Sequence, residues 1–216
     1  MVSAEAGPAG GSPILDKLDP FSSRQADRLP PDIGPSETAL LVIDMVHDYL
    51  DPAGAMPLPD TAPVLAAARR LADAAHGSNV LLVWVRPGHF EQADGLFRKR
   101  IVHALEGTRG PRLHPSLPVL PTDRVLHKRR YSAFFATDLD LYLREHRIRR
   151  AVLAGVALNI CVRATVHDAF FLGYDVWLAA DACQATGRRE HDSTLYDVQT
   201  HFGTVLTVAN IEKAWQ

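Results

Sequence analysis

Six apolar segments alternate with helix-forming segments along most of the chain. Residues 39–45 read ALLVIDM, a continuous apolar run typical of a central parallel strand that is buried on both faces. Strands are also predicted at residues 79–86, 124–128, 151–154, 176–180 and 203–211. Helices are predicted at residues 62–75, 159–173 and 190–201, and another should begin at Thr137, a good N-cap residue. The alternation predicts an α/β domain of three layers around a doubly wound parallel sheet.

Two stretches lack this periodicity. Residues 1–36 are rich in Ala, Gly, Ser and Pro, which predicts a flexible tail followed by an extended arm, so the folded domain should cover residues 37–216. Residues 87–121 contain several Gly, Pro and His residues and few periodic signals. A loop region this long in a compact domain usually forms part of a site or an interface.

Composition and charge favour small partners. The formal net charge is -2, so the chain has no basic surface suited to nucleic acid or to an anionic membrane. No apolar window is long enough to span a membrane, and no secretory signal is present, so we expect a cytoplasmic protein. The two cysteines form no metal-like pair and no disulfide framework. The arm and the long loop favour self-association, as a homodimer or a homotetramer.

Three of the predicted strands end near side chains that could take part in catalysis. Asp44 ends the first, Lys128 ends the third, and Cys161 lies in the first turn of the helix after the fourth. Free N–H groups and the helix dipole favour a thiolate at such a position, although a lone cysteine is more often a small core residue. Asp44 could equally cap the following turn. Together the three would supply a nucleophile, a base and a cation that stabilises negative charge.

Four motifs on these strand ends occur in the order found in a known family. They read LLVIDMVHDYL, GTRGPRLHPSL, HKRRYSAFFATDLDLYL and GVALNICVRATVHDAFFLGYDVWLAADA. Over about residues 38–210 the chain resembles the isochorismatase-like cysteine hydrolases. This family includes nicotinamidases, N-carbamoylsarcosine amidohydrolases, ureidoacrylate amidohydrolases and biuret hydrolases. The resemblance implies a six-stranded parallel sheet in the order 3-2-1-4-5-6.

The resemblance also implies a catalytic set and a reaction. Asp44, Lys128 and Cys161 occupy the catalytic positions, and a cis peptide bond would join Val156 to Ala157. The backbone N–H groups of Ala157 and Cys161 would then stabilise an oxyanion. This implies hydrolysis of a C–N bond in a small carboxamide, N-carbamoyl or ureide substrate through a thioester. Two alternatives stay open: a vinyl-ether hydrolase, although true isochorismatases carry glycine in place of Cys161, and a catalytically silent interaction subunit.

Metal ligands and substrate contacts are harder to assign. Nicotinamidases bind a metal through one aspartate and two histidines, whereas this chain offers only Asp51 and His89, so we predict neither a metal nor a cofactor. Val46 and Leu158 replace polar residues common in the family, which predicts a less polar pocket. Candidate substrate contacts share a position in the loops that follow the strands: Tyr49, His89, Phe90, Arg98, Tyr131, Phe134, Phe135 and Asn159.

Overall fold

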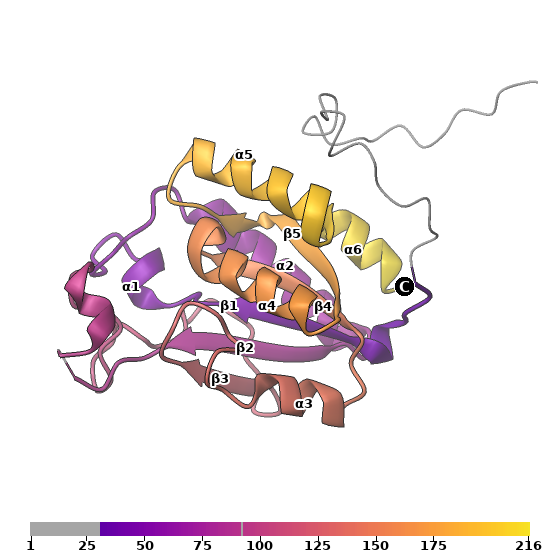
Figure 1. Ribbon diagram of the computed structural model, residues 1–216, viewed down its shortest axis with the longest axis horizontal. Coiled ribbons are helices and arrows are strands. Elements are labelled where there is room, and N and C mark those ends of the chain that lie inside the picture. Colours follow the sequence, from indigo (N-terminus) through magenta and orange to yellow (C-terminus); the bar gives the residue numbers. More distant parts are fainter. Residues whose placement is uncertain (1–30, 92) are drawn as a thin grey trace, which may run out of the picture.

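A parallel sheet of six strands runs through the computed structural model in the order β3-β2-β1-β4-β5-β6, which confirms the predicted topology (Figure 1). The structure describes residues 31–91 and 93–216. Most of the predicted tail and arm therefore lies outside the described residues. The strands are β1 (Thr38–Ile43), β2 (Leu81–Pro87), β3 (Arg124–Lys128), β4 (Arg150–Val156), β5 (Asp175–Gln184) and β6 (Thr204–Leu206).

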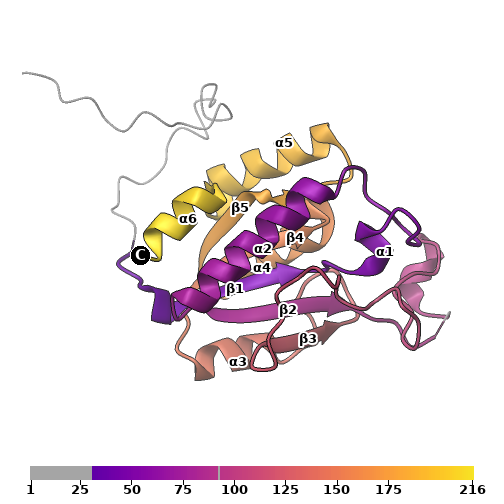
Figure 2. The same cartoon turned by 180° about the vertical axis from the view of Figure 1, so that it is seen from behind.

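Helices cover both faces of this sheet and complete the three layers (Figures 1 and 2). One face packs against α2 (Ala62–Gly77) and α6 (Val208–Ala214). The other packs against α3 (Leu139–Glu145), α4 (Arg163–Phe171) and α5 (Arg188–Asp197). A short helix, α1 (His47–Leu50), follows β1. No helix in the described part of the chain is long and apolar enough to span a membrane.

The apolar run of β1 is explained by burial on both sides. Leu41 and Ile43 point into the core under α3, α4 and α5, whereas Leu40 and Val42 point into the core under α2 and α6. All four side chains are fully buried. A strand with two buried faces cannot alternate polar with apolar residues, so the unbroken pattern correctly identified the centre of the sheet.

The end of the chain differs from the prediction. Residues 203–211 were expected to form one strand, but β6 ends at Leu206 and the chain turns into α6. The Thr207 side chain caps this helix by accepting a hydrogen bond from the Asn210 N–H (3.3 Å). Val208 and Ile211, spaced three residues apart, are buried against α2. The helical spacing and the cap therefore prevailed over the strand-like composition.

Two further helix starts are shifted. The helix predicted to begin at Thr137 begins at Leu139 with Asp138 at its N-cap, although the Thr137 hydroxyl does accept a hydrogen bond from the Leu139 N–H (3.3 Å). The helix predicted from Asn159 begins as a π-helical turn, Leu158–Val162, that continues into α4. This turn carries Cys161, so the cysteine does lie at the start of a helix.

Two arginines, Arg149 and Arg150, fix the first described residues to the domain, and Arg149 donates to the Asp32 carbonyl (3.4 Å). The Arg150 guanidinium donates hydrogen bonds to the carbonyl oxygens of Ile33 (2.9 Å) and Pro31 (3.3 Å). It also forms an ion pair with Asp175 (2.5 Å) and lies over the ring of Trp177, 3.7 Å from the centroid. The end of the predicted arm therefore packs against the amino-terminal edge of β4 and β5.

Candidate active site

Asp44, Lys128 and Cys161 converge at the carboxyl edge of the sheet. The Lys128 ammonium lies 2.8 Å from Oδ2 of Asp44. The Cys161 thiol is within hydrogen-bonding reach of both side chains. β1 and β4 are neighbours at the point where the strand order reverses, and open α/β sheets form crevices for ligands there.

The backbone around Asp44 is unusual. Asp44 has φ 54°, in the left-handed region, and its N–H donates to the Val85 carbonyl (2.8 Å) while its carbonyl accepts from Val46 (2.8 Å). Aspartate adopts this conformation more readily than most residues. Beside it, Gly155 has φ 114°, and a Cβ atom there would lie 2.1 Å from the carbonyl oxygen of Ile43. Only glycine lets β4 approach β1 this closely next to the carboxylate.

An unusual turn precedes Cys161, the candidate nucleophile. The peptide bond between Val156 and Ala157 is cis, at the position that the family resemblance implied. The π-helical turn follows directly, with Ala157 at its N-cap. Within α4, the Thr165 hydroxyl donates to the Cys161 carbonyl (2.8 Å). Cys161 is therefore fixed from both sides, and 7 % of its surface remains exposed.

Burial sets the electrostatics of the three groups. Asp44 is fully buried and Lys128 is 2 % exposed. Burial raises the pKa of Asp44 even though Lys128 acts to lower it. For Lys128, burial is the largest effect and acts to lower the pKa, but the charges and hydrogen bonds of Asp44 and Cys161 together outweigh it and the pKa is raised. Burial also raises the pKa of Cys161 to about 12, so the free enzyme holds a thiol. The helix start was expected to favour a thiolate, but loss of solvent has the larger effect.

A small cavity of about 60 Å³ opens onto Cys161. Cys161 and Ala157 are among the residues that line it. Burial raises the pKa of Tyr49 well above its usual value, so this phenol keeps its proton and can donate a hydrogen bond. Most of the remaining lining is apolar or aromatic: Tyr49, Met56, Leu58, Tyr131 and Ile160. Three polar side chains from distant segments complete it: Arg100, His103 and Thr186.

The long loop after β2 supplies His103, which the sequence did not single out. The Asp48 carboxylate accepts a hydrogen bond from the Ala104 N–H (2.6 Å) and so ties this loop to α1. His103 is 5 % exposed, and its Nδ1–H donates to the Ile101 carbonyl (2.8 Å). Because a carbonyl can only accept, Nδ1 carries a proton, and Nε2 can accept a hydrogen bond whenever the ring holds no second proton.

The family follows from the match of sequence and fold around this site. Residues 38–210 match the model of the isochorismatase domain. The chain belongs to the isochorismatase family. This confirms the prediction of an isochorismatase-like hydrolase made from the four motifs.

Its relatives define the enzyme class. The chain is 33% identical to the ureidoacrylate amidohydrolase RutB of Enterobacter sp. (strain 638) over 202 residues, which are 82% of this chain and 88% of that protein. An isochorismatase-like hydrolase from Alkaliphilus metalliredigens matches with a TM-score of 0.79 and 33% identity, covering 83% of this chain and 100% of that one. N-carbamoylsarcosine amidase from Thermoplasma acidophilum matches with a TM-score of 0.72 and 29% identity, covering 80% and 96%. The comparisons confirm a hydrolase acting on carbon–nitrogen bonds other than peptide bonds.

Three of the candidate substrate contacts in this isochorismatase-like hydrolase are at the cavity or next to it. Tyr49 and Tyr131 line it. Asn159 instead holds a residue that lines it: its amide donates to the Thr186 hydroxyl (2.9 Å), and its carbonyl accepts from the Thr186 N–H (3.1 Å). This pair joins the nucleophile turn to the end of β5.

Three other candidates do not line the cavity, and their role as substrate contacts stays a prediction. His89 is buried and pairs with Asp94 (Nδ1 to Oδ2, 3.2 Å), which holds the loop after β2 together. Phe90 is 64 % exposed and packs against the ring of His127. Phe135 is 61 % exposed. Val46 and Leu158, the two apolar replacements, are fully buried beside the site and do not line the cavity either.

The side chains considered as metal ligands do not form a metal site. The Asp51 carboxylate binds Nδ1 of His47 (2.6 Å) and lies 3.3 Å from the Arg109 guanidinium. His89 binds Asp94 instead. Across residues 31–91 and 93–216, no three His, Cys, Asp or Glu side chains are grouped so that they could hold a metal ion. The residues present do not fit the metal of the nicotinamidases, and the chemistry below involves none.

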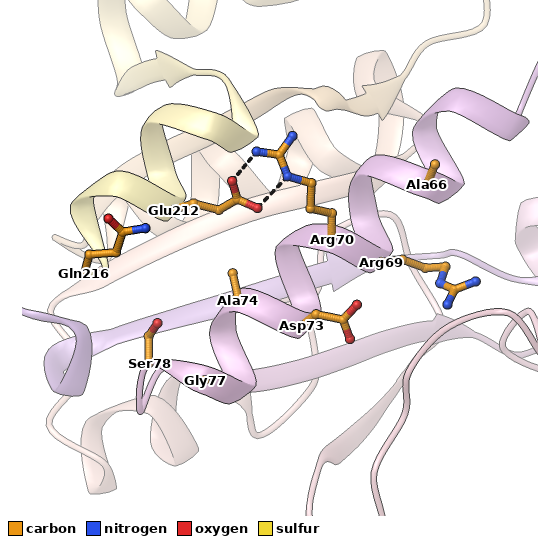
Figure 3. Close-up of a pocket in the computed structure, with 9 residues that line it drawn as sticks. All are labelled: Ala66, Arg69, Arg70, Asp73, Ala74, Gly77, Ser78, Glu212 and Gln216. Atoms are coloured by element: carbon orange, nitrogen blue, oxygen red, sulfur yellow. Dashed lines mark hydrogen bonds and ion pairs between the residues drawn. The ribbon is translucent and has the colours of Figure 1, made fainter.

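A larger hollow of about 660 Å³ lies along α2 and α6, away from these groups (Figure 3). It is spanned by a two-pronged ion pair between Arg70 and Glu212, in which Nε lies 2.6 Å from Oε1. Its lining contains no thiol, imidazole or lysine. Size alone would point here, but it is the smaller cavity that Cys161 lines.

Proposed function

We propose that this protein hydrolyses the C–N bond of a small carboxamide, N-carbamoyl or ureide substrate through a thioester on Cys161. The observation that carries the proposal is the meeting of the thiol, the Asp44 carboxylate and the Lys128 ammonium next to a cavity that Cys161 lines. The names of two relatives, a ureidoacrylate amidohydrolase and an N-carbamoylsarcosine amidase, support a carbamoyl or ureide group.

The first half-reaction forms the thioester. A thiol with a pKa of about 12 needs a base at neutral pH, and burial makes Asp44 a stronger base than an ordinary aspartate. Asp44 takes the thiol proton as sulfur forms a bond to the carbonyl carbon. The carbonyl electrons move onto oxygen, where the N–H groups of Ala157 and Cys161 stabilise the negative charge. The C–N bond then breaks, and Asp44 returns the proton to the departing nitrogen.

The second half-reaction releases the acid. Asp44 takes a proton from water as the water oxygen attacks the thioester carbon. The carbon–sulfur bond breaks, and the proton returns from Asp44 to sulfur. Lys128 keeps its charge throughout and stabilises the carboxylate and the thiolate in turn. One carboxylate thus serves as base and acid in alternation.

The cavity suits a small substrate. Its volume is only about 60 Å³, which limits the size of the group that can enter. Tyr49 can donate a hydrogen bond to the substrate, and Nε2 of His103 can accept one from a substrate N–H. An acceptor for N–H and a small volume both favour a carbamoyl or ureide group.

Two measurements test the function. Purified protein is incubated with a panel of ureides, N-carbamoyl amino acids and primary amides, and release of ammonia or amine is followed. Acid quenching during turnover, followed by intact mass measurement, should reveal an acyl adduct that maps to Cys161. Cys183→Ala is the matched control, because Cys183 is a buried cysteine that does not line the cavity and its loss should leave turnover in place. Turnover by a Cys161→Ala variant would refute the mechanism.

A further inference from the structure

Lys128 reaches the catalytic groups from the edge of the sheet. β3 is the outermost strand of the sheet, whereas Asp44 follows the central strand β1 and Cys161 follows β4. After Lys128 the chain forms neither helix nor strand until α3 begins at Leu139. The backbone that follows this lysine must therefore be held in place by side chains.

Three partners surround the Lys128 ammonium. It lies 2.8 Å from Oδ2 of Asp44, it is within hydrogen-bonding reach of the Cys161 thiol, and it donates to the Arg130 carbonyl (3.0 Å). An ammonium has three N–H donors, so each donor has one acceptor. Asp44 and Cys161 exchange a proton in the proposed reaction, whereas the Arg130 carbonyl does not change. That carbonyl is therefore the fixed point that holds the ammonium.

One buried carboxylate holds the backbone of this segment. The side chain of Asp94 is fully buried and accepts from the guanidinium groups of Arg129 (3.0 Å) and Arg130 (3.3 Å). Arg130 also donates to the Arg129 carbonyl (2.7 Å). In the loop after β2, the same carboxylate accepts from the Leu96 N–H (3.0 Å) and from Nδ1 of His89 (3.2 Å). Asp94 thus joins the loop after β2 to the segment that follows β3.

The Asp94 carboxylate keeps its charge across the working pH range. Burial acts to raise its pKa, but hydrogen bonds from Leu96, Arg129 and His89 outweigh burial, so the pKa lies well below the usual aspartate value. The two guanidinium groups are about half exposed. Their pairing with a fixed charge, rather than packing, therefore immobilises them.

We propose that Asp94 is a positioning residue, which fixes the Lys128 ammonium by holding the backbone of Arg130. The inference rests on the proposed cysteine hydrolysis, in which that ammonium stabilises the carboxylate and the thiolate in turn. Neither Asp94 nor Arg130 lines the cavity. Their effect on the reaction therefore passes through the lysine and not through contact with the substrate.

A displaced ammonium would stabilise the catalytic carboxylate less. Burial raises the pKa of Asp44, and Lys128 acts against that rise. At an effective dielectric constant of about 20, moving the ammonium from 2.8 Å to about 3.8 Å from the carboxylate raises the pKa of Asp44 by about one pH unit. Asp94→Asn should therefore shift the acid-side midpoint of kcat/KM upward by about one pH unit. It should also lower kcat by about 10-fold with little change in KM.

The midpoint separates positioning from instability. A smaller folded fraction lowers kcat in proportion but leaves the midpoint in place. Arg130→Gln is a second variant, because its side chain is about half exposed and the fold should tolerate its loss. It should shift the midpoint in the same direction, and Arg130→Lys should restore part of the native value. The double variant Asp94→Asn/Arg130→Gln should shift the midpoint no further than Asp94→Asn alone, because both substitutions break one link.

Asp175→Asn is the matched control. Asp175 pairs with Arg150 (2.5 Å) at the amino-terminal edge of the sheet, so its replacement breaks another Arg–Asp pair away from the site. Urea unfolding should show a loss of stability, while the midpoint stays at the native value. An unchanged midpoint in both Asp94→Asn and Arg130→Gln, or an equal shift in Asp175→Asn, would overturn the inference.

Labelling of Cys161 by iodoacetamide separates the inference from the proposed function. Burial raises the pKa of Cys161, Lys128 acts against that rise, and the thiolate is the form that reacts. At pH 8, mass measurement of the peptide that contains Cys161 should show labelling about 10-fold slower in Asp94→Asn than in the native protein. Slower labelling without turnover of any substrate by the native protein would uphold Asp94 as a positioning residue and refute the hydrolysis. Turnover with an unchanged midpoint and unchanged labelling in Asp94→Asn would do the reverse.

Discussion

Replacing Lys128 with methionine tests the buried ion pair directly. Methionine is close to lysine in length and shape but carries no charge, so the substitution removes the ammonium and leaves the carboxylate of Asp44 fully buried. Besides the thiol and the lysine, neither oxygen of Asp44 has a hydrogen-bond donor among the described residues. The negative charge would then have only the thiol to stabilise it.

The size of the effect follows from that burial. Removing one partner of a buried ion pair costs about 3 to 5 kcal/mol, because the other charge stays buried and uncompensated. At about 2 to 4 °C per kcal/mol for a domain of this size, Tm should fall by about 6 to 20 °C. The double variant Asp44→Asn/Lys128→Met removes both charges and should recover most of this loss. It is the matched control for packing.

The loss should depend on pH in a defined direction. Burial already raises the pKa of Asp44, and removing Lys128 raises it further. The folded variant therefore binds a proton that the unfolded chain, with a pKa of about 3.9, has released. Its stability should fall as pH rises above about 4, until the pH passes the pKa of the folded state. Urea unfolding at pH 5 and pH 8 measures this. A Lys128→Met protein as stable as the native one at pH 8 would contradict the reasoning.

Three further variants or profiles extend the test. Cys161→Ser and Cys161→Ala should both abolish turnover while urea unfolding stays close to that of the native protein, because the side chain borders a cavity. On the acid side, kcat/KM should fall with a midpoint above the ordinary aspartate pKa of about 3.9. Burial raises the pKa of Asp44, and the base acts only when it is ionised. A midpoint at or below about 3.9 would contradict Asp44 as the base. Gly155→Ala should lower the free energy of unfolding, measured in urea, by at least about 2 kcal/mol and should reduce activity, because the new Cβ would clash with the Ile43 backbone at a positive φ. Gly77→Ala is the control: its Cβ would meet open space, so the change should be neutral or slightly stabilising.

The fold was largely predictable because burial leaves a clear pattern. β1 is buried on both faces and reads as an uninterrupted apolar run, and the strands after it end at Lys128 and before Cys161 as expected. The last segment was mispredicted because its residues alternate like a strand while Thr207 and the spacing of Val208 and Ile211 also suit a helix. Local pattern alone could not decide between the two periods.

Most residues that line the cavity were much less predictable from the sequence than Cys161. His103 and Arg100 come from a loop without periodicity, and they reach the cavity because Asp48, 56 residues before Ala104, binds the backbone of that loop. Thr186, just after the end of β5, is held at the cavity by its two hydrogen bonds with Asn159. Such long-range contacts leave no local signal in the sequence beyond the length of the loop.

The left-handed backbone at Asp44 restricts how the base can be replaced in any experiment or redesign. Asparagine tolerates that conformation nearly as well as aspartate, whereas a β-branched residue adopts it poorly. Changes made with asparagine therefore report on proton transfer, whereas a β-branched residue would mix lost chemistry with a displaced loop. The backbone conformation at Asp44 thus makes asparagine the replacement that tests the reaction without disturbing the fold.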